Sequence, residues 1–354
     1  MGMASPDGGQ PVRAWIARHR RALSVGGHLL ILGLVVWFLV RPQIGSTQDS
    51  LALLSEVQVP WLGGAIAAEL VSLTAYTFLT YRLLAPATRP RWWTVARVDI
   101  SAIGLGKCLP DGGAAGTALS VRLFALDGVP AGDAAVAKVV QGLGSAVLLQ
   151  VLVFAGLGTA VALGLGSTWA SPLLVVAGGF VLTATLIGLG LSRPRLWSWL
   201  ERVAGGVPRF GGRLVGLLRG LRDGQGLAHL KAVGATPVLL AELILYSAAN
   251  WVFDALALWM ALESFHADVG IRAILVAYAA QAIGTWIPLT PGGLGVAESI
   301  MIPAVVAYGA TRPAAVDGIL AWRLLSYWIP ILAGAAAYLS LTTRRDRSKT
   351  TSDG

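Results

Sequence analysis

Long apolar runs dominate this chain and decide what it can fold into. They cover residues 23–40, 59–84, 139–165, 171–191, 236–262, 273–289 and 316–342. Most of them are long enough to cross a hydrocarbon core of about 30 Å as helices, and the alternating pattern of a membrane β-barrel is not found in the sequence. With 55% hydrophobic and only 13% charged residues, the composition is that of a polytopic, all-α membrane protein.

The basic residues set the expected orientation. Most of the 27 lysines and arginines fall in a tail at residues 1–22, in the segment 82–97, in a loop at 192–235 and in a tail at 343–354. Because such residues accumulate in cytoplasmic loops, these segments and both termini are expected on the cytoplasmic side of the cell inner membrane. The same rule explains the net charge of +9 without a nucleic acid partner.

The chain is expected to form a single transmembrane domain over residues 23–342. The basic tail at 1–22 precedes it, and residues 343–354 are expected to be a basic, disordered C-terminal tail. In the loop 192–235, apolar residues fall on one helical face and arginines flank them, which predicts an amphipathic helix lying on the inner leaflet.

Two apolar segments contain helix breakers and are expected to be re-entrant hairpins. Between the cytoplasmic segments 82–97 and 192–235 the number of crossings must be even, and the runs 139–165 and 171–191 already supply two. Residues 98–127 should therefore enter and leave on the cytoplasmic side, and by the same argument 271–309 should enter and leave from outside. The predicted architecture is about six full spans plus two hairpins, with eight or more apolar helices in all.

The turns of these hairpins should lie inside the protein, because unpaired backbone groups at membrane depth are tolerated only where protein or a wet cavity surrounds them. We therefore expect the two tips to meet near the midplane. The tip residues are Pro110, Asp111, Gly112 and Gly113 in the first hairpin and Pro291, Gly292, Gly293 and Gly295 in the second.

An internal repeat supports the pairing of the hairpins. A shift of 180 residues aligns, without a gap, residues 102–104 with 282–284, 112–113 with 292–293 and 134–136 with 314–316. The repeat units extend over about 98–165 and 271–342. Two similar hairpins that enter from opposite faces form a pseudo-inverted repeat, the architecture in which transporters place their substrate between broken helices.

Several ionisable residues lie within the apolar segments. Each costs at least about 2.5–3.5 kcal/mol on insertion scales, so each should face a partner or a transport pathway. The basic ones are Lys107, Arg122, Lys138 and Arg323, and the acidic ones are Glu69, Asp111, Glu242, Asp254 and Glu298.

Three of the basic residues are candidates for binding a phosphate. Arg323 offers a planar fork of donors that matches phosphate oxygens, and it could equally neutralise Glu298. Lys107 and Arg122 flank the first tip, where free N–H groups of a returning half-helix favour an anion, although Lys107 could instead pair with Asp111.

Three other charged residues have simpler interpretations. Lys138 is expected to snorkel to the cytoplasmic surface. Glu298 follows Gly295 at a helix start, where a carboxylate caps free N–H groups, and it could also carry protons. Glu69 has no partner nearby in the sequence, so it could carry protons or pair with an arginine.

Catalytic and metal chemistry are not expected. The single cysteine, Cys108, excludes an internal disulfide, and the four histidines are too scattered for a metal cluster. No phosphate-binding loop, zinc-protease or serine-hydrolase motif is found. We therefore expect no catalytic residues, no metal and no cofactor.

The strings "IPLTPGGLGVAES", "AWRLLSYWIPI" and "LPDGGAAGTALSVRLFALDGVP" resemble the flippase-like transmembrane domain of lysylphosphatidylglycerol synthases. The resemblance extends from about Val25 to Leu341, and it implies a translocase that moves an anionic or aminoacylated phospholipid between leaflets. The residues that match the family pattern are Arg122, Pro291, Gly292, Gly293, Gly295, Glu298 and Arg323.

The chain departs from that pattern at Ala297, where a basic residue is common, and at Gln141 and Gly142, where an acid followed by arginine is frequent. The soluble aminoacyl-transferring domain of the full-length synthases is not found, so synthase activity is not expected and a separate lipid-modifying enzyme is a possible partner. Two other functions remain open: an ion-coupled exporter of a small anionic solute, and an integral-membrane transferase acting on polyprenyl-linked substrates.

Overall fold

The computed structural model describes residues 57–109, 112–160, 236–286 and 290–350. Within these ranges all regular structure is helical, as predicted. Four helical segments are long and apolar enough to cross a membrane. They are α3 (Val59–Leu83), α6 (Ala131–Ala160), α11 (Pro237–Glu263), and one continuous rod made of α14 (Arg312–Arg323), η4 (Leu324–Trp328) and α15 (Ile329–Thr350).

The two predicted hairpin segments form pairs of shorter helices. The first pair is α4 (Trp92–Cys108) and α5 (Gly112–Leu126), and the second is α12 (Ile271–Trp286) and α13 (Val296–Ala307), with the short turn η3 (Pro291–Gly293) before α13. In each pair the second helix packs back along the first. The helix α13 has 12 residues and is thus about 18 Å long at about 1.5 Å per residue, well short of a hydrocarbon core of about 30 Å.

The helix boundaries repeat along the chain. When 180 is added to the first residues of α3, α4, α5 and α6, each falls within two residues of the start of α11, α12, η3 and α14, respectively. The packing repeats as well, since α4 lies along α15 while α12 lies along α6. The repeat therefore includes the helix before each hairpin and is longer than the sequence comparison indicated.

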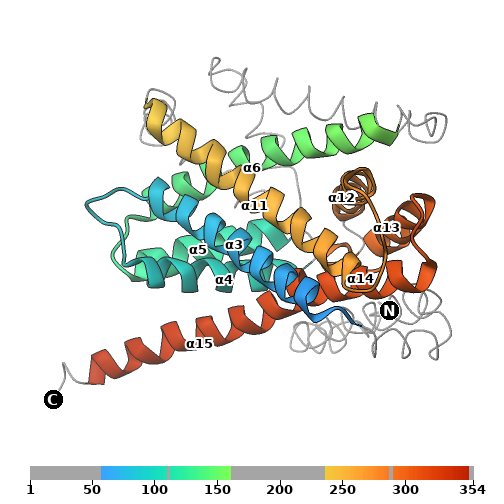
Figure 1. Cartoon of the computed structure of the whole chain (residues 1–354). Helices are drawn as coiled ribbons and strands as arrows, with labels where there is room; N and C mark the ends of the chain where they lie inside the picture. The colour runs from blue at the N-terminus through green and yellow to red at the C-terminus, as the bar shows by residue number, and fades with distance from the viewer. Residues whose placement is uncertain (1–56, 110–111, 161–235, 287–289, 351–354) are drawn as a thin grey trace, which may run out of the picture.

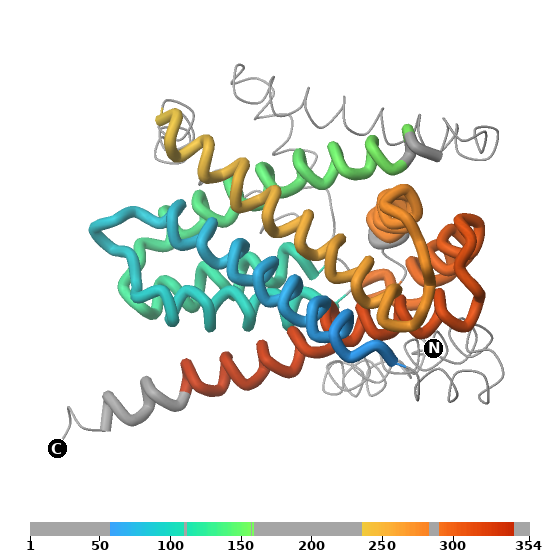
Figure 2. Tube along the Cα trace, in the orientation of Figure 1, coloured from blue at the N-terminus to red at the C-terminus, as the bar shows by residue number. Residues whose placement is uncertain are grey.

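The two leading helices of the repeat, α3 and α11, are antiparallel and lie side by side through the middle of the molecule (Figures 1 and 2). The N–H of Gln58, at the start of α3, donates to the carbonyl of Ser264, at the end of α11, over 3.0 Å. At their other ends, Arg82 and Glu242 form an ion pair of 2.8 Å. Equivalent helices thus run in opposite directions.

Small residues let the long C-terminal rod approach the first hairpin. A Cβ added at Gly334 of α15 would lie 2.5 Å from the carbonyl oxygen of Ile100 in α4. Backbones this close exclude larger side chains and give tight van der Waals packing, which is how helices associate in the absence of a hydrophobic driving force.

Several boundaries differ from the predictions. The helix α6 begins at Ala131 rather than 139, and Lys138, just before the predicted apolar run, forms an ion pair with Asp99 of α4. The helix α4 begins at Trp92, before the predicted 98. Residues 343–350, predicted to be a disordered tail, continue α15 as a helix. The runs 23–40 and 171–191, the N-terminal tail and the amphipathic loop lie outside the described residues.

Candidate functional site

The hydroxyl of Tyr327 joins the two hairpin tips. It lies 2.6 Å from the carbonyl oxygen of Lys107, at the end of α4, and 3.2 Å from that of Pro291, in η3. Its single proton can serve either acceptor, and the shorter distance favours Lys107. The end of α4, just before the first tip, therefore lies next to the second tip, while Pro110 and Asp111 are outside the described residues.

The second tip needs glycine where it contacts this tyrosine. Gly292 has φ +60°, in the left-handed region. A Cβ added there would lie 2.1 Å from a ring carbon of Tyr327. Both the backbone conformation and the close approach of the ring thus require a residue without a side chain.

A proline in the C-terminal rod leaves a backbone carbonyl without its usual donor, and Lys107 donates to that carbonyl. Pro330 has no N–H, so the carbonyl of Ser326, four residues earlier, lacks its usual α-helical donor. The rod is locally a π-helix here, over Leu324–Trp328, a distortion that is frequent at functional sites. The ammonium of Lys107 donates to this Ser326 carbonyl and lies 5.7 Å from the centre of the Tyr327 ring.

Arg323 and Glu298 form a buried ion pair beside the second tip. Their exposed fractions are 4% and 5%, and Nε of Arg323 lies 2.5 Å from Oε1 of Glu298. The other carboxylate oxygen of Glu298 accepts the N–H of Gly295 over 2.6 Å at the start of α13. Both contacts expected for Glu298 are present, and its two oxygens are thereby used.

The guanidinium of Arg323 is only partly satisfied. Its Nε lies close to the carboxylate but is not aligned for a hydrogen bond, and its buried Nη2 has no hydrogen-bond partner among the described residues. We regard the contact with Glu298 as a charge interaction, since the distance is short and the angle is poor. The guanidinium also lies over the rings of Trp322 and Tyr327, at 5.3 and 6.0 Å, a cation–π arrangement.

A second cluster lies where α3 and α11 pack together. The hydroxyl of Tyr278 donates to Oδ2 of Asp254 over 2.5 Å, and the indole N–H of Trp322 donates to Oδ1 over 3.2 Å. Glu69 faces Asp254, since the neighbouring turns of α3 and α11 are joined by the hydrogen bonds between Ser72 and Asn250. Lys107 interacts electrostatically with both carboxyl groups. We call Glu69, Asp254, Tyr278, Trp322 and Lys107 the carboxyl-pair cluster.

Lys138 does not snorkel, and that prediction is wrong. It is 6% exposed and forms an ion pair of 3.0 Å with Asp99 of α4. Its ammonium also donates to Gln141 over 2.6 Å, and it lies 3.2 Å from the hydroxyl of Tyr76. The fold brings an anion close enough to hold the charge inside, which removes the need to reach water.

The remaining predicted site residues are spread more widely. Arg122 is exposed on α5, and Gly113 is exposed at the start of the same helix. Glu242 pairs with Arg82 rather than facing the interior site. The structure thus brings together Lys107, Glu69, Glu298, Arg323 and the second tip, and leaves Arg122 away from the buried charges.

Several of these polar side chains do not stand out in the sequence. Asp99 lies in a short helix that begins in a polar segment, so it was not counted among the membrane charges. Tyr278 and Tyr327 lie in apolar runs, where a tyrosine is unremarkable. Pro330, which frees the Ser326 carbonyl, was a usable indication of the position that Lys107 occupies.

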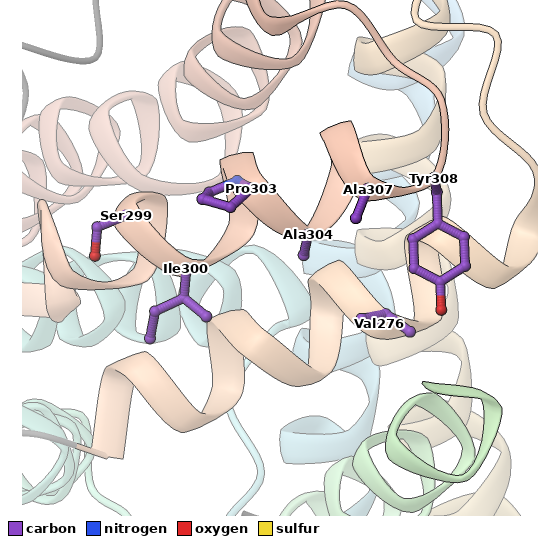
Figure 3. Close-up of a pocket in the computed structure, with 7 residues that line it drawn as sticks. All are labelled: Val276, Ser299, Ile300, Pro303, Ala304, Ala307 and Tyr308. Carbon is purple, nitrogen blue, oxygen red and sulfur yellow. The ribbon is translucent and has the colours of Figure 1, made fainter. Parts of the chain in front are cut away.

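An apolar groove of about 300 Å³ lies between α12 and α13 (Figure 3). Its lining follows α13 from Ser299, next to Glu298, to Tyr308, and Val276 of α12 closes the other side. The lining residues are Val276, Ser299, Ile300, Pro303, Ala304, Ala307 and Tyr308. Within the described ranges, no group of three or more His, Cys, Asp or Glu side chains is placed to hold a metal ion.

Comparisons with known proteins agree with this helical membrane architecture. A family model described as lysylphosphatidylglycerol synthase TM region matches residues 23–334. A UPF0104 membrane protein of Methanocaldococcus jannaschii is 28% identical over 30% of this chain and 32% of its own length. A UPF0104 membrane protein of Pyrococcus horikoshii is 29% identical over 28% of this chain and 30% of its length. The chain spans about a third of the curated relatives that it matches.

Proposed function

Because the chain belongs to the lysylphosphatidylglycerol synthase TM region family, we propose that it is a lipid translocase of the cell inner membrane. It moves an anionic or aminoacylated phospholipid, or a lipid-linked headgroup, between the leaflets. The observation that carries the proposal is Arg323, a buried arginine whose Nη2 has no hydrogen-bond partner among the described residues.

The pathway lies in an inverted repeat. The antiparallel arrangement of α3 and α11 supports this architecture, because the symmetry axis relating them lies in the membrane plane if both helices cross the bilayer. The short helices of each pair then form re-entrant hairpins that enter from opposite faces. Their lengths support this reading, since the returning helices α5 and α13 have 15 and 12 residues, fewer than the roughly 20 of an ordinary span.

The headgroup phosphate binds between the two tips. Arg323 supplies planar donors and Lys107 a compact positive charge, the two ways in which proteins bind phosphate. Glu298 holds Arg323 in place and leaves part of its hydrogen-bonding capacity for the ligand. Buried donors without an acceptor destabilise the protein. A bound phosphate that accepts their hydrogen bonds offsets this destabilisation, which favours binding.

The acyl chain lies in the apolar groove between α12 and α13. The groove begins at Ser299, directly after Glu298, so a lipid whose phosphate is at the tips can extend its chain along α13. Its lining is mostly apolar, which suits a hydrocarbon chain and does not suit a hydrated solute.

The phosphate site is tested by exchanging arginine for lysine at two positions. The protein is reconstituted in vesicles with a fluorescent phosphatidylglycerol, and the leaflet exchange of the probe is followed by its quenching from outside. For Arg323→Lys we expect a loss of about tenfold, which corresponds to about 1.4 kcal/mol of lost bidentate binding. For Arg122→Lys, an exposed position, we expect a change of less than about twofold.

Equal rates in wild type and Arg323→Lys would remove Arg323 from the pathway. Uptake of inorganic phosphate into the same vesicles, without any exchange of the lipid probe, would instead identify an exporter of a small anion.

The groove is tested by adding a ring at its rim. Ala307 lines the groove and Val306, next to it, does not, and both are exposed. Ala307→Phe should slow lipid exchange by obstructing the chain, while Val306→Phe should leave it unchanged because its ring faces away from the groove. Equal exchange rates for the two variants would show that the acyl chain takes another route.

A further inference from the structure

Two carboxyl groups meet in the interior of this membrane protein, and neither is used by the phosphate site. Glu69 of α3 and Asp254 of α11 lie on facing turns of the two helices, because each is one turn away from a residue of the hydrogen-bonded pair Ser72 and Asn250. Glu69 is only 7% exposed and Asp254 is half-buried, and the two carboxyl groups interact electrostatically. Two negative charges on facing turns repel each other, and more strongly where water screens them poorly.

One carboxylate oxygen of the pair accepts no hydrogen bond from the surrounding described residues. Both oxygens of Asp254 are occupied, by Tyr278 at 2.5 Å and Trp322 at 3.2 Å. The Oε2 atom of Glu69 is buried and has no hydrogen-bond partner among the described residues. Ionised carboxylates only accept hydrogen bonds, so the two groups can bond to each other only if one of them carries a proton.

Three further helices contribute groups that interact with the pair. Tyr278 of α12 and Trp322 of α14 supply neutral donors, and Lys107 of α4 supplies a positive charge that interacts with both carboxyl groups. Arg323 of α14 repels Lys107 but is itself held by Glu298. Lys107 is therefore the group that both the carboxyl pair and the phosphate site can attract.

We propose that Glu69 and Asp254 together bind one proton from water, and that this proton couples lipid transport to the pH difference across the membrane. The inference rests on the proposed function, since it assigns an energy source to the same site. One O–H bond of a hydronium ion breaks, one O–H bond to a carboxylate oxygen forms, and a water molecule is released. The charge of the pair changes from two negative charges to one, and no electron is transferred.

Lys107 links the charge of the carboxyl pair to phosphate binding through electrostatic attraction. When both carboxyl groups are ionised, they hold the ammonium of Lys107 on their side. When one is protonated, this attraction weakens and Lys107 is free to bind the headgroup phosphate beside Arg323. The proton and the phosphate thus favour each other's binding, and by linkage the effect is reciprocal.

The shared proton is tested directly by infrared spectroscopy of the purified full-length protein. A protonated carboxyl group has a carbonyl stretching band that is distinct from that of a carboxylate. We expect this band in the wild type, its loss in Glu69→Gln and in Asp254→Asn, and its retention in Glu242→Gln, whose carboxyl group pairs with Arg82 at the far end of α11. The same band in all four proteins, or its absence from the wild type, would overturn the proton site.

The coupling is tested in vesicles that contain fluorescent phosphatidylglycerol and a trapped pH dye. Above the titration range of the pair, wild-type transport should fall by about tenfold for each pH unit, as for a step that needs one proton, and Glu69→Gln should be insensitive to pH. Wild-type lipid transport without pH dependence and without proton movement would overturn the coupling and leave the proposed function intact. No lipid transport at any pH, with the infrared band lost in Glu69→Gln, would instead reject the proposed function and keep the proton site.

Discussion

Two buried polar clusters occupy equivalent places in the two halves of the repeat, and they differ in charge balance. Each joins the first, second and fourth helix of its half. Adding 180 to the numbers of Tyr76, Asp99 and Gln141 leads to within two residues of Asp254, Tyr278 and Trp322, respectively. In the first half, Asp99 is neutralised by Lys138 of the same half. We call this group, with Tyr76 and Gln141, the balanced cluster.

In the second half, the position equivalent to Lys138 is Gly318, so no matching cation is present there. Asp254 interacts instead with another carboxyl group, Glu69, and with Lys107, both of which the first half supplies. A cluster that contains its own counter-ion stabilises helix packing and has little left to bind. When the counter-ion comes from a hairpin tip, as Lys107 does, ligand binding at that tip can change the charge balance of the cluster. The packing scaffold is thus repeated, while the two clusters differ in their charges and in the half of the chain that supplies them.

The largest expected effect comes from breaking the balanced cluster. Lys138→Met leaves the carboxylate of Asp99 buried without its counter-ion, which should lower the free energy of unfolding by about 3–5 kcal/mol. Lys107→Met should cost less, about 1.5–3 kcal/mol, because it removes one hydrogen bond from a charged donor, while it should abolish lipid transport. Unfolding by denaturing detergent in mixed micelles measures the first quantity.

The double variant Lys138→Met with Asp99→Leu serves as the control for this experiment. Replacing both partners of a buried pair by apolar residues is often nearly neutral, so most of the stability should return. If Lys138→Met is as stable as the wild type, the balanced cluster has no structural role and the contrast between the two clusters fails.

A smaller effect is expected from comparing the two hairpin tips. Gly292→Ala places a methyl group against the ring of Tyr327 and forces alanine into a left-handed conformation, which should cost about 1–3 kcal/mol. Gly113→Ala, at the other tip, meets nothing within 4 Å and should be neutral or slightly stabilising in a helix. The same detergent titration measures both, and equal stabilities would show that the second tip is not packed against Tyr327.

The smallest effect is expected where the tips are joined. Tyr327→Phe removes the hydroxyl that lies between the carbonyls of Lys107 and Pro291 and keeps the ring. It should cost about 0.5–1.5 kcal/mol, the usual value of one hydrogen bond. Hydrogen exchange at residues 105–109 should increase, whereas exchange in α3 should not. A uniform increase over the whole protein would mean that Tyr327 stabilises the fold globally rather than the junction of the tips.

Much of the architecture could be predicted from the sequence because hydropathy and charge act locally. The predicted run 59–84 became α3, and 236–262 became α11, each within two residues. The interruptions at residues 109–113 and 286–299 became the turns between paired short helices, since proline and glycine end helices wherever they occur. The pairing of Glu298 with Arg323 was one of two roles that the sequence left open for Arg323, the other being phosphate binding.

The details of the site could not be predicted, because they depend on contacts between distant residues. Lys138 looked like a residue near a membrane surface until Asp99 was placed beside it. Glu69 had no partner within its own segment, and its neighbour Asp254 is far along the chain, on a helix that packs against α3. A one-dimensional pattern shows that a charge is buried, and it does not show which charge it faces.

The sequence by itself determined that this is a helical membrane protein with two interrupted segments and an internal repeat, because apolar length, helix breakers and periodicity are properties of local stretches. Only the tertiary structure decided which polar groups share a cluster, that Tyr327 joins the two tips, and that a carboxyl pair lies where α3 and α11 pack together. The physical reason is that ion pairing and hydrogen bonding depend steeply on distances of a few ångströms, and packing between helices from both halves of the chain sets those distances.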